Sequence, residues 1–175
     1  IGARIIPQRG SWVELMLDSD NMLWVNIDRR KKMPASILLR ALGVSSNEDI
    51  IALFSETKKI KVAKTKPETL VGKILASSIV NEEDGDILLE AGDTIDTTAY
   101  EAIVELGIKT VSVVTEEESL DNIILSKTLS KDETKTEEDA LFYIYQSMRP
   151  GPPPNVETAR NLITRLFFDD KRYDL

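Results

Sequence analysis

The stretch ARIIPQRGSWVELMLDSDNMLWVNIDRRKKMPASILLRALG, from Ala3 to Gly43, combines an alternating apolar pattern with a run of basic residues. Residues 12–18 and 22–28 alternate with period two, and the polar triplet 19–21 separates them. Strict alternation on both sides of a polar turn is typical of a β-hairpin that buries one face. We therefore predict a hairpin with an apolar face toward the core.

The register of this hairpin follows from its turn. With Asp20 at the apex, Met16 lies opposite Trp24, and Trp12 lies opposite Asp28. The large ring of Trp12 then lies on the more polar face, next to the carboxylate that begins the basic run.

The flanking sequence predicts further elements from periodicity, caps and breakers. Before the hairpin we expect a strand at 3–7. After it we expect a helix from Pro34 to Gly43 and a second helix whose capping box pairs Ser45 with Glu48. In the middle of the chain, the sequence pattern predicts a basic connector at 58–66 and strands at 70–79, 87–90 and 109–114. It also predicts a helix at 97–106 and one more strand at 123–129. The last third predicts a helix at 137–148 and another capped by Asn155.

Charge and composition limit the classes of function. The formal net charge of -8 is uneven, because residues 67–139 carry five basic and nineteen acidic side chains, whereas residues 1–40 carry seven basic and four acidic ones. The chain has no cysteine and no histidine, which removes disulfides, thiolate metal sites and the commonest general base. No apolar run has the roughly 18 residues of a membrane span, so we expect a soluble protein.

Motifs for catalysis or metal binding are weak. The acidic stretch 82–86 lacks the alternation of an EF-hand loop, and we interpret it as a solvated turn. No phosphate-binding loop or dinucleotide glycine motif occurs. An independent enzyme is therefore disfavoured.

The basic run Arg29–Lys32 has two interpretations. It can be a solubilising rim on an edge strand. It can also contact nucleic acid, because basic side chains bind phosphates while an exposed ring stacks on an unpaired base. A helix-turn-helix at 34–54 is disfavoured, since its second helix is acidic at its N-terminal end.

Three ordered motifs resemble a known family. ARIIPQRGSW, VNIDRRKKMPASILLRALG and MRPGPPP…ARNLITRLFFDDKRYDL resemble the lobe, or second domain, of the bacterial RNA polymerase beta subunit. Pro152 stands where that family usually has glutamate, and Gln8 where it often has an aromatic residue. Family sequences continue beyond RYDL, so we expect the chain to be part of a longer polypeptide.

The middle of the chain resembles a second kind of module. GKILASSIVNEEDGDILLEAGDTIDTTAYEAIVELGIKTVSVVT is similar to the sandwich-barrel modules of the beta and beta-prime subunits. The expected fold class is α+β, a mixed helix and antiparallel-sheet lobe with a small β-rich insert. We assign residues 1–57 and 122–175 to the discontinuous lobe and 58–121 to the insert, and expect residues 67–115 to fold alone.

The resemblance implies a role by position. The lobe lines the downstream DNA channel, and the tryptophan that matches Trp12 stacks on an unpaired non-template base. The implied DNA-binding residues are Trp12, Asp28, Arg29, Arg30, Lys31, Arg4 and Arg9. No cofactor is expected here, because the catalytic magnesium of the whole enzyme is held by another subunit. Expected partners are non-template and downstream DNA, the beta-prime and alpha subunits and sigma factor, in the bacterial cytoplasm at the nucleoid.

A different class of function stays open. The chain can instead be a protein-interaction or assembly module whose acidic insert docks a transcription factor. Loss of single-strand binding on Trp12→Ala separates the two hypotheses, because only the first predicts it.

Overall fold

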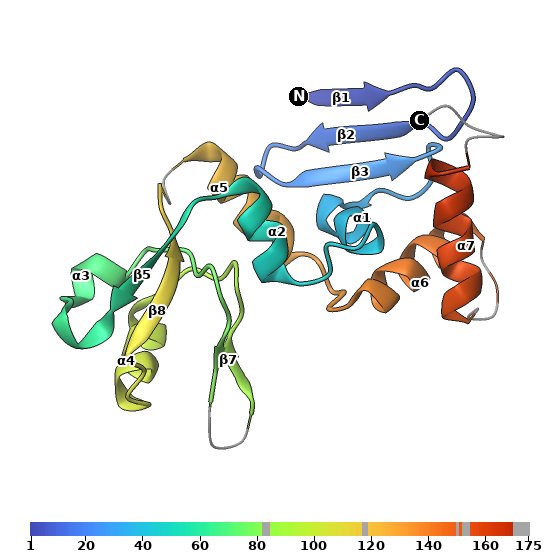
Figure 1. Ribbon diagram of the computed structural model, residues 1–175. Coiled ribbons are helices and arrows are strands. Elements are labelled where there is room, and N and C mark those ends of the chain that lie inside the picture. Colours follow the sequence, from blue (N-terminus) through green and yellow to red (C-terminus); the bar gives the residue numbers. More distant parts are fainter. Residues whose placement is uncertain (82–84, 117–118, 150, 152–154, 170–175) are drawn as a thin grey trace. The chain divides into compact units, whose positions relative to one another are not determined.

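The computed structural model describes residues 1–81, 85–116, 119–149, 151 and 155–169 (Figure 1). The chain divides into two compact units, of which the first unit is Ile1–Ser46 with Lys131–Leu175 and the second unit is Asn47–Ser130. Helices and small antiparallel sheets occur together, so the predicted α+β class is confirmed. The described strands do not close into a barrel.

The first unit contains a four-stranded antiparallel sheet. Its strands are β1 (Gly2–Ile5), β2 (Val13–Leu17), β3 (Leu23–Ile27) and β4 (Met33–Pro34), in the order β1-β2-β3-β4. Met16 pairs with Trp24 and Val13 with Ile27, which confirms the predicted hairpin register. Aliphatic side chains alternate in these strands with side chains of mixed polarity, and this period-two pattern specifies the register.

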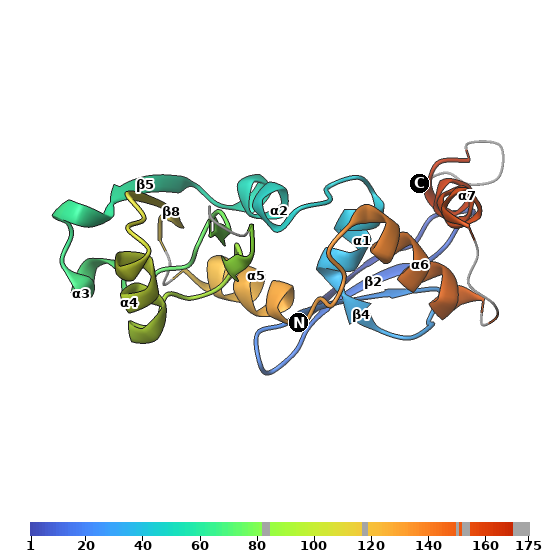
Figure 2. The same cartoon turned by 90° about the horizontal axis from the view of Figure 1, so that it is seen from below.

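Three helices cover one face of this sheet. They are α1 (Ala35–Ala41), α6 (Glu137–Met148) and α7 (Val156–Phe167), and α6 contacts both α1 and α7 (Figures 1 and 2). Their apolar side chains form one core with Val13, Val25 and Ile27 of the hairpin. We call the opposite side of the sheet, which carries Trp24, the outer face.

Caps and a buried ion pair fix the helices of the first unit. Thr136 and Asp139 form a capping box at the start of α6, and Asn155 accepts a hydrogen bond of 2.8 Å from the Thr158 backbone N–H, as predicted for α7. Arg40 of α1 and Asp132 are both buried and lie 3.0 Å apart from Nε to Oδ2. This pair ties the two sequence segments of the unit together.

The second unit is built from short elements. In chain order they are α2 (Asn47–Phe54), β5 (Thr57–Lys61), the 3₁₀ turn η1 (Val62–Lys64), α3 (Pro67–Leu70), β6 (Ile79–Val80), β7 (Ile87–Leu89), α4 (Thr97–Glu105), β8 (Thr110–Val114) and α5 (Leu120–Ser130). Strand β5 pairs with β8, and β6 pairs with β7. A separate apolar core includes Leu75, Ile95, Ile103 and Val113.

Three predicted elements in this unit are wrong. The predicted strand at 70–79 is mostly irregular, because Pro67 begins a helical turn and only Ile79–Val80 is a strand. The predicted strand at 123–129 lies inside α5, since a short apolar run fits either structure. The predicted basic connector contains β5.

The predicted capping box at Ser45 is also wrong. Helix α2 begins at Asn47, and the Glu48 carboxylate accepts the Ser78 backbone N–H at 2.8 Å instead. Burial raises the pKa of Glu48, but the hydrogen bonds from the Ser78 hydroxyl and backbone N–H outweigh it and leave that pKa below its ordinary value.

The unit boundaries differ from the predicted ones at 57/58 and 121/122. The structure divides the chain after Ser46 and after Ser130, because α2 and α5 contact each other. The side chains of Ser55 and Asn122 are also hydrogen-bonded. Both helices therefore belong to the second unit. Among the described residues, no helix is both long and apolar enough to cross a membrane.

Candidate nucleic-acid interface

Trp12 lies at the end of the hairpin and is only half-buried. Its backbone N–H donates to Oδ1 of Asp28 at 2.8 Å, and the Asp28 backbone N–H donates to the Trp12 carbonyl at 2.9 Å. The second bond continues the β2–β3 ladder by one residue pair, whereas in the first the Asp28 carboxylate is the acceptor. The expected proximity of Trp12 and Asp28 is present in the structure.

A tight turn follows Asp28 and places a cation at the ring. Asp28 and Arg29 have φ values of 49° and 56°, and the Arg30 backbone N–H donates to the Ile27 carbonyl at 2.9 Å. Two consecutive left-handed residues are typical of a type I′ hairpin turn, and such backbone is costly for residues other than glycine. The turn carries the Arg29 guanidinium carbon to 5.0 Å from the centroid of the Trp12 ring.

These three residues line a small hollow. Trp12, Asp28 and Arg29 surround a volume of about 300 Å³ at the surface. The indole face can stack on a flat ligand, and the guanidinium group can bind a negative charge of that ligand, such as a phosphate. We call this hollow the Trp12 site.

The other predicted site residues are not among those that line the Trp12 site. Arg30, Lys31 and Arg9 are exposed. Arg4 of β1 is paired with Glu14 of β2, with 2.6 Å between Nε and Oε1. The structure therefore gathers Trp12, Asp28 and Arg29, while Arg4 is engaged in an ion pair on the neighbouring strands.

Sequence reasoning did not assign Lys32 or Trp24 to the site. The Lys32 ammonium lies 4.5 Å from the centroid of the Trp24 ring. The Trp24 indole N–H donates to Oδ2 of Asp18 at 2.7 Å. The period-two pattern places Trp24 on the same face as Trp12, and Lys32 lies in the same basic run as Arg29. These two features of the sequence could have assigned both residues to this surface.

Asp18 is held as a carboxylate by its neighbours. The backbone N–H of Met22, the Trp24 indole and the backbone N–H of Asp20 donate to it, and Lys32 adds an attractive charge. Together they lower the pKa of Asp18 below its ordinary value. The hairpin turn and the Trp24 ring are thus fixed by one ionised group.

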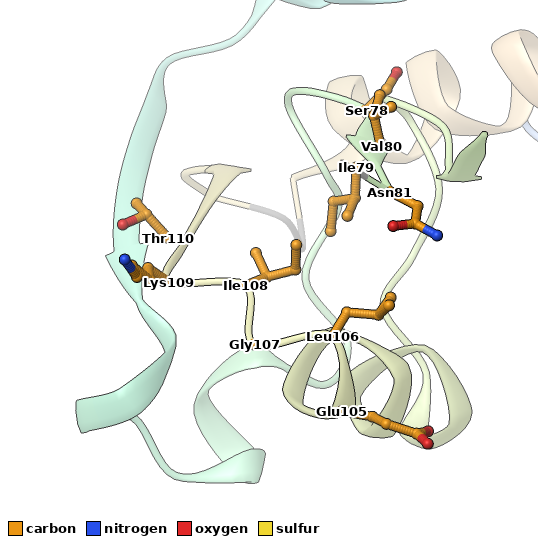
Figure 3. Close-up of a pocket in the computed structure, with 10 residues that line it drawn as sticks. All are labelled: Ser78, Ile79, Val80, Asn81, Glu105, Leu106, Gly107, Ile108, Lys109 and Thr110. Carbon is orange, nitrogen blue, oxygen red and sulfur yellow. The ribbon is translucent and has the colours of Figure 1, made fainter. Parts of the chain in front are cut away.

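The second unit has a hollow of a different kind. Its volume is about 640 Å³. Figure 3 shows the side chains that line it, which come from the β6 segment and from the stretch between the end of α4 and the start of β8. Of its apolar lining residues, Ile79 is buried and Ile108 is half-buried, whereas Val80 and Leu106 are exposed. The polar lining residues are Ser78, Asn81, Glu105, Lys109 and Thr110.

The two units differ in charge. The second unit contains eight lysines and seventeen acidic residues, a net charge of -9, whereas the first contains fourteen basic and thirteen acidic residues, a net charge of +1. The acidity of the chain therefore belongs to the second unit. Among the described residues, no group of three or more acidic side chains is arranged to hold a metal ion.

Comparisons with known proteins agree with the motifs. The model of the family "RNA polymerase Rpb2, domain 2" matches residues 3–76. The DNA-directed RNA polymerase subunit beta of Leptospira biflexa is 38% identical over 176 residues, which cover 99% of this chain and 14% of that protein. The same subunit of Protochlamydia amoebophila is 42% identical over 176 residues, covering 98% of this chain and 14% of the relative.

A third relative has a similar identity and coverage. The DNA-directed RNA polymerase subunit beta of Chlorobium chlorochromatii is 37% identical over 177 residues, which cover 99% of this chain and 14% of that protein. The chain thus spans about one seventh of the length of the curated relatives it matches. Over nearly its whole length it is similar to one segment of the bacterial DNA-directed RNA polymerase beta subunits, and its residues 3–76 match the family model "RNA polymerase Rpb2, domain 2".

Proposed function

We propose that this chain acts as a non-catalytic lobe of a bacterial RNA polymerase beta subunit, which lines the downstream DNA channel and contacts the unpaired non-template strand during transcription. The observation that carries the proposal is the Trp12 site, where a half-exposed indole has the Arg29 guanidinium 5.0 Å from its centroid. Its family relationship supports the same role.

The chemistry of the Trp12 site suits a single strand better than a duplex. A ring can stack on a base only when the base has left its own stack, and each such contact contributes about 1–3 kcal/mol whatever the base. Arg29 can bind the neighbouring phosphate while it remains close to the ring. Asp28 holds the Trp12 backbone by two hydrogen bonds, which keeps the ring in place before DNA arrives.

The exposed basic residues extend this surface. Arg30 and Lys31 directly follow Arg29 in the chain, and they and Arg9 are exposed and suit contacts with the DNA backbone. Contacts of this kind position a strand without reading its sequence. Nucleotide transfer itself, with its magnesium, belongs in this proposal to another subunit of the polymerase, and beta-prime, alpha and sigma are the partners of the whole protein in the bacterial cytoplasm, at the nucleoid.

The test is binding of an oligonucleotide to the 175-residue chain at low salt, measured by tryptophan fluorescence. We expect a short oligo(dT) to quench the fluorescence, and Trp12→Leu to weaken binding by about 1–3 kcal/mol. Phe168→Leu is the matched control, since Phe168 is an exposed aromatic residue of the same unit beyond α7. Equal affinities of wild type and Trp12→Leu would contradict the proposal.

A second function is favoured by the hollow of the second unit. We propose that this hollow docks a basic amphipathic segment of a transcription factor. Val80 and Leu106 are 42% and 41% exposed beside it, and the unit carries a net charge of -9. The charged lining residues Glu105 and Lys109 balance each other, so the acidity is that of the unit as a whole. Exposed apolar side chains on an acidic unit favour a partner whose own apolar stripe is flanked by lysine or arginine.

Peptide titration tests this second function. The probe is a 14-residue amphipathic helix of leucine and lysine, and the control peptide has glutamate in place of lysine. We expect only the basic peptide to bind, and Leu106→Ser to weaken it about tenfold or more. Val71→Ser is the control variant, because Val71 is exposed in the same unit and does not line the hollow. Equal binding of both peptides, or no effect of Leu106→Ser, would rule this function out.

A further inference from the structure

A second aromatic ring with a cation over it lies on the outer face of the sheet. Trp24 of β3 lies between Met16 of β2 and Pro34 of β4, and the Lys32 ammonium is 4.5 Å from its ring centroid. Trp24 is half-buried, and Met16 beside it is 36% exposed. This arrangement repeats the pairing of Trp12 with Arg29.

The Trp24 ring is held in one orientation. Its indole N–H donates to Oδ2 of Asp18 at 2.7 Å, and Oδ1 of Asp18 accepts the backbone N–H groups of Asp20 and Met22 at 2.9 Å. A ring fixed in this way loses little conformational entropy when a ligand stacks on it. Trp24 is therefore preorganised as a flat surface.

Both rings lie outside the core of the first unit. The core of the unit uses Val13, Val25 and Ile27 on the other face of the sheet. Both cations come from the single short segment Asp28–Lys32 between β3 and β4. A tryptophan needed only for packing would be expected on the core face, where the helices cover it.

The distance between the rings suits a strand of several nucleotides. The Trp12 and Asp28 pair is four residues along the ladder from the Met16 and Trp24 pair, which corresponds to about 13 Å. Stacked bases rise about 3.4 Å each, so this distance is about four stacked steps and fewer steps of an extended strand. A dinucleotide is too short to reach both rings.

We propose that Trp24 and Lys32 form a second stacking site, so that one unpaired DNA strand lies along the outer face from Trp12 to Trp24. This inference rests on the proposed function of the Trp12 site and extends it to a defined path. The long side chain of Lys32 leaves the ring when a base takes its place, and its ammonium group then contacts a phosphate.

The test compares dT2 with dT6 on the full 175-residue chain. We expect wild type to bind dT6 more tightly than dT2, and Trp24→Leu to reduce the ratio of the two affinities about fivefold or more. Lys32→Gln should reduce the salt slope of dT6 binding by about 0.7, the value for one lost phosphate contact with a single strand. Arg160→Gln is the matched control, because it removes one positive charge from α7, which lies on the face of the sheet opposite the outer face.

A second measurement avoids replacing Trp24. In Trp12→Phe, an aromatic ring still occupies the first site and Trp24 is the one remaining tryptophan of the chain. Addition of dT6 should then quench its fluorescence, whereas unchanged fluorescence at saturating dT6 overturns the second site.

The outcomes separate the two proposals. If Trp12→Leu weakens dT6 binding and neither Trp24→Leu nor Lys32→Gln does, the Trp12 site stands and the second site is wrong. If all variants bind like wild type, both are wrong. If Trp24→Leu weakens binding and Trp12→Leu does not, the strand does not follow the proposed path, and both are wrong as stated.

Discussion

Asp28 has two roles in a single residue. Its carboxylate accepts the Trp12 backbone N–H at 2.8 Å, and its backbone adopts a φ of 49° to begin the turn that carries Arg29 to the ring. Aspartate and asparagine tolerate this left-handed backbone better than other residues with a Cβ atom. Residue type and backbone geometry therefore agree at this position.

This double role predicts different effects for two substitutions. Asp28→Asn keeps a side-chain acceptor and the left-handed backbone, so the free energy of unfolding should change by less than about 1 kcal/mol. Asp28→Ala loses both and should lower it by about 2–3 kcal/mol. Urea unfolding of the chain measures both values. Equal losses for the two variants would contradict the prediction that asparagine retains the acceptor and the turn conformation.

Asp18 gives the hairpin a pH dependence. Because the hydrogen bonds of Met22, Trp24 and Asp20 lower its pKa in the folded protein, its contribution to stability is complete above its ordinary pKa of 3.8. The contribution is lost as the pH falls through the lower value of the folded state. Asp18→Asn should therefore destabilise the chain at pH 7, and the difference from wild type should shrink in acid.

Thermal unfolding of both proteins between pH 2 and pH 7 tests this. In Trp12→Phe, where Trp24 is the one tryptophan, the fluorescence should change over the same acidic range, because protonation of Asp18 weakens its bond to the indole. A stability difference that stays constant down to pH 2 would contradict the role of Asp18.

At the scale of elements, the hairpin was predictable and the second unit was only partly so. Period-two alternation with a polar turn has one solution that buries Val13, Val25 and Ile27 together, and the observed register follows it. The run at 123–129 has no such constraint, since its apolar residues fit a strand or a helix. It became α5 because α2 offers it a packing partner.

Helix α5 also constrains the turn before α4. Gly92 has a φ of 98°, and a Cβ atom there would lie 3.1 Å from Cδ1 of Leu129. Gly72 has a φ of 91°, but a Cβ atom there would meet nothing within 4 Å. The two glycines share the backbone requirement and differ in the available space.

We therefore expect Gly92→Ala to destabilise the second unit more than Gly72→Ala. The left-handed backbone should lower the free energy of unfolding of both variants by about 1–2 kcal/mol. Crowding against Leu129 should lower that of Gly92→Ala by about 1 kcal/mol more. Chemical unfolding followed by circular dichroism compares them. The packing of α5 on this turn would be refuted by equal losses.

At the scale of the whole molecule, the chain contains two units, each with its own apolar core and with a different net charge. The first unit is assembled from two distant segments, joined by the buried pair of Arg40 and Asp132. The second unit is continuous and contains its own core. Its termini at Asn47 and Ser130 lie on α2 and α5, which contact each other.

This division predicts which fragment folds. Residues 47–130 should give a cooperative thermal transition by circular dichroism, because they hold the whole core of the second unit. Residues 67–115, which the sequence pattern favoured, should not, because they lack β5, the partner of β8. A folded 67–115 fragment would show that β5, α2 and α5 are dispensable.

The sequence by itself determined the hairpin, its register, most helices and the closeness of Trp12 to Asp28, because these depend on neighbours within a few residues or on one alternating pattern. The tertiary structure alone decided the unit boundaries, the identity of α5 and the engagement of Arg4 with Glu14. It also decided that Lys32 lies over Trp24. Each of these depends on which distant surface is available to pack against, and a local pattern carries no information about that surface.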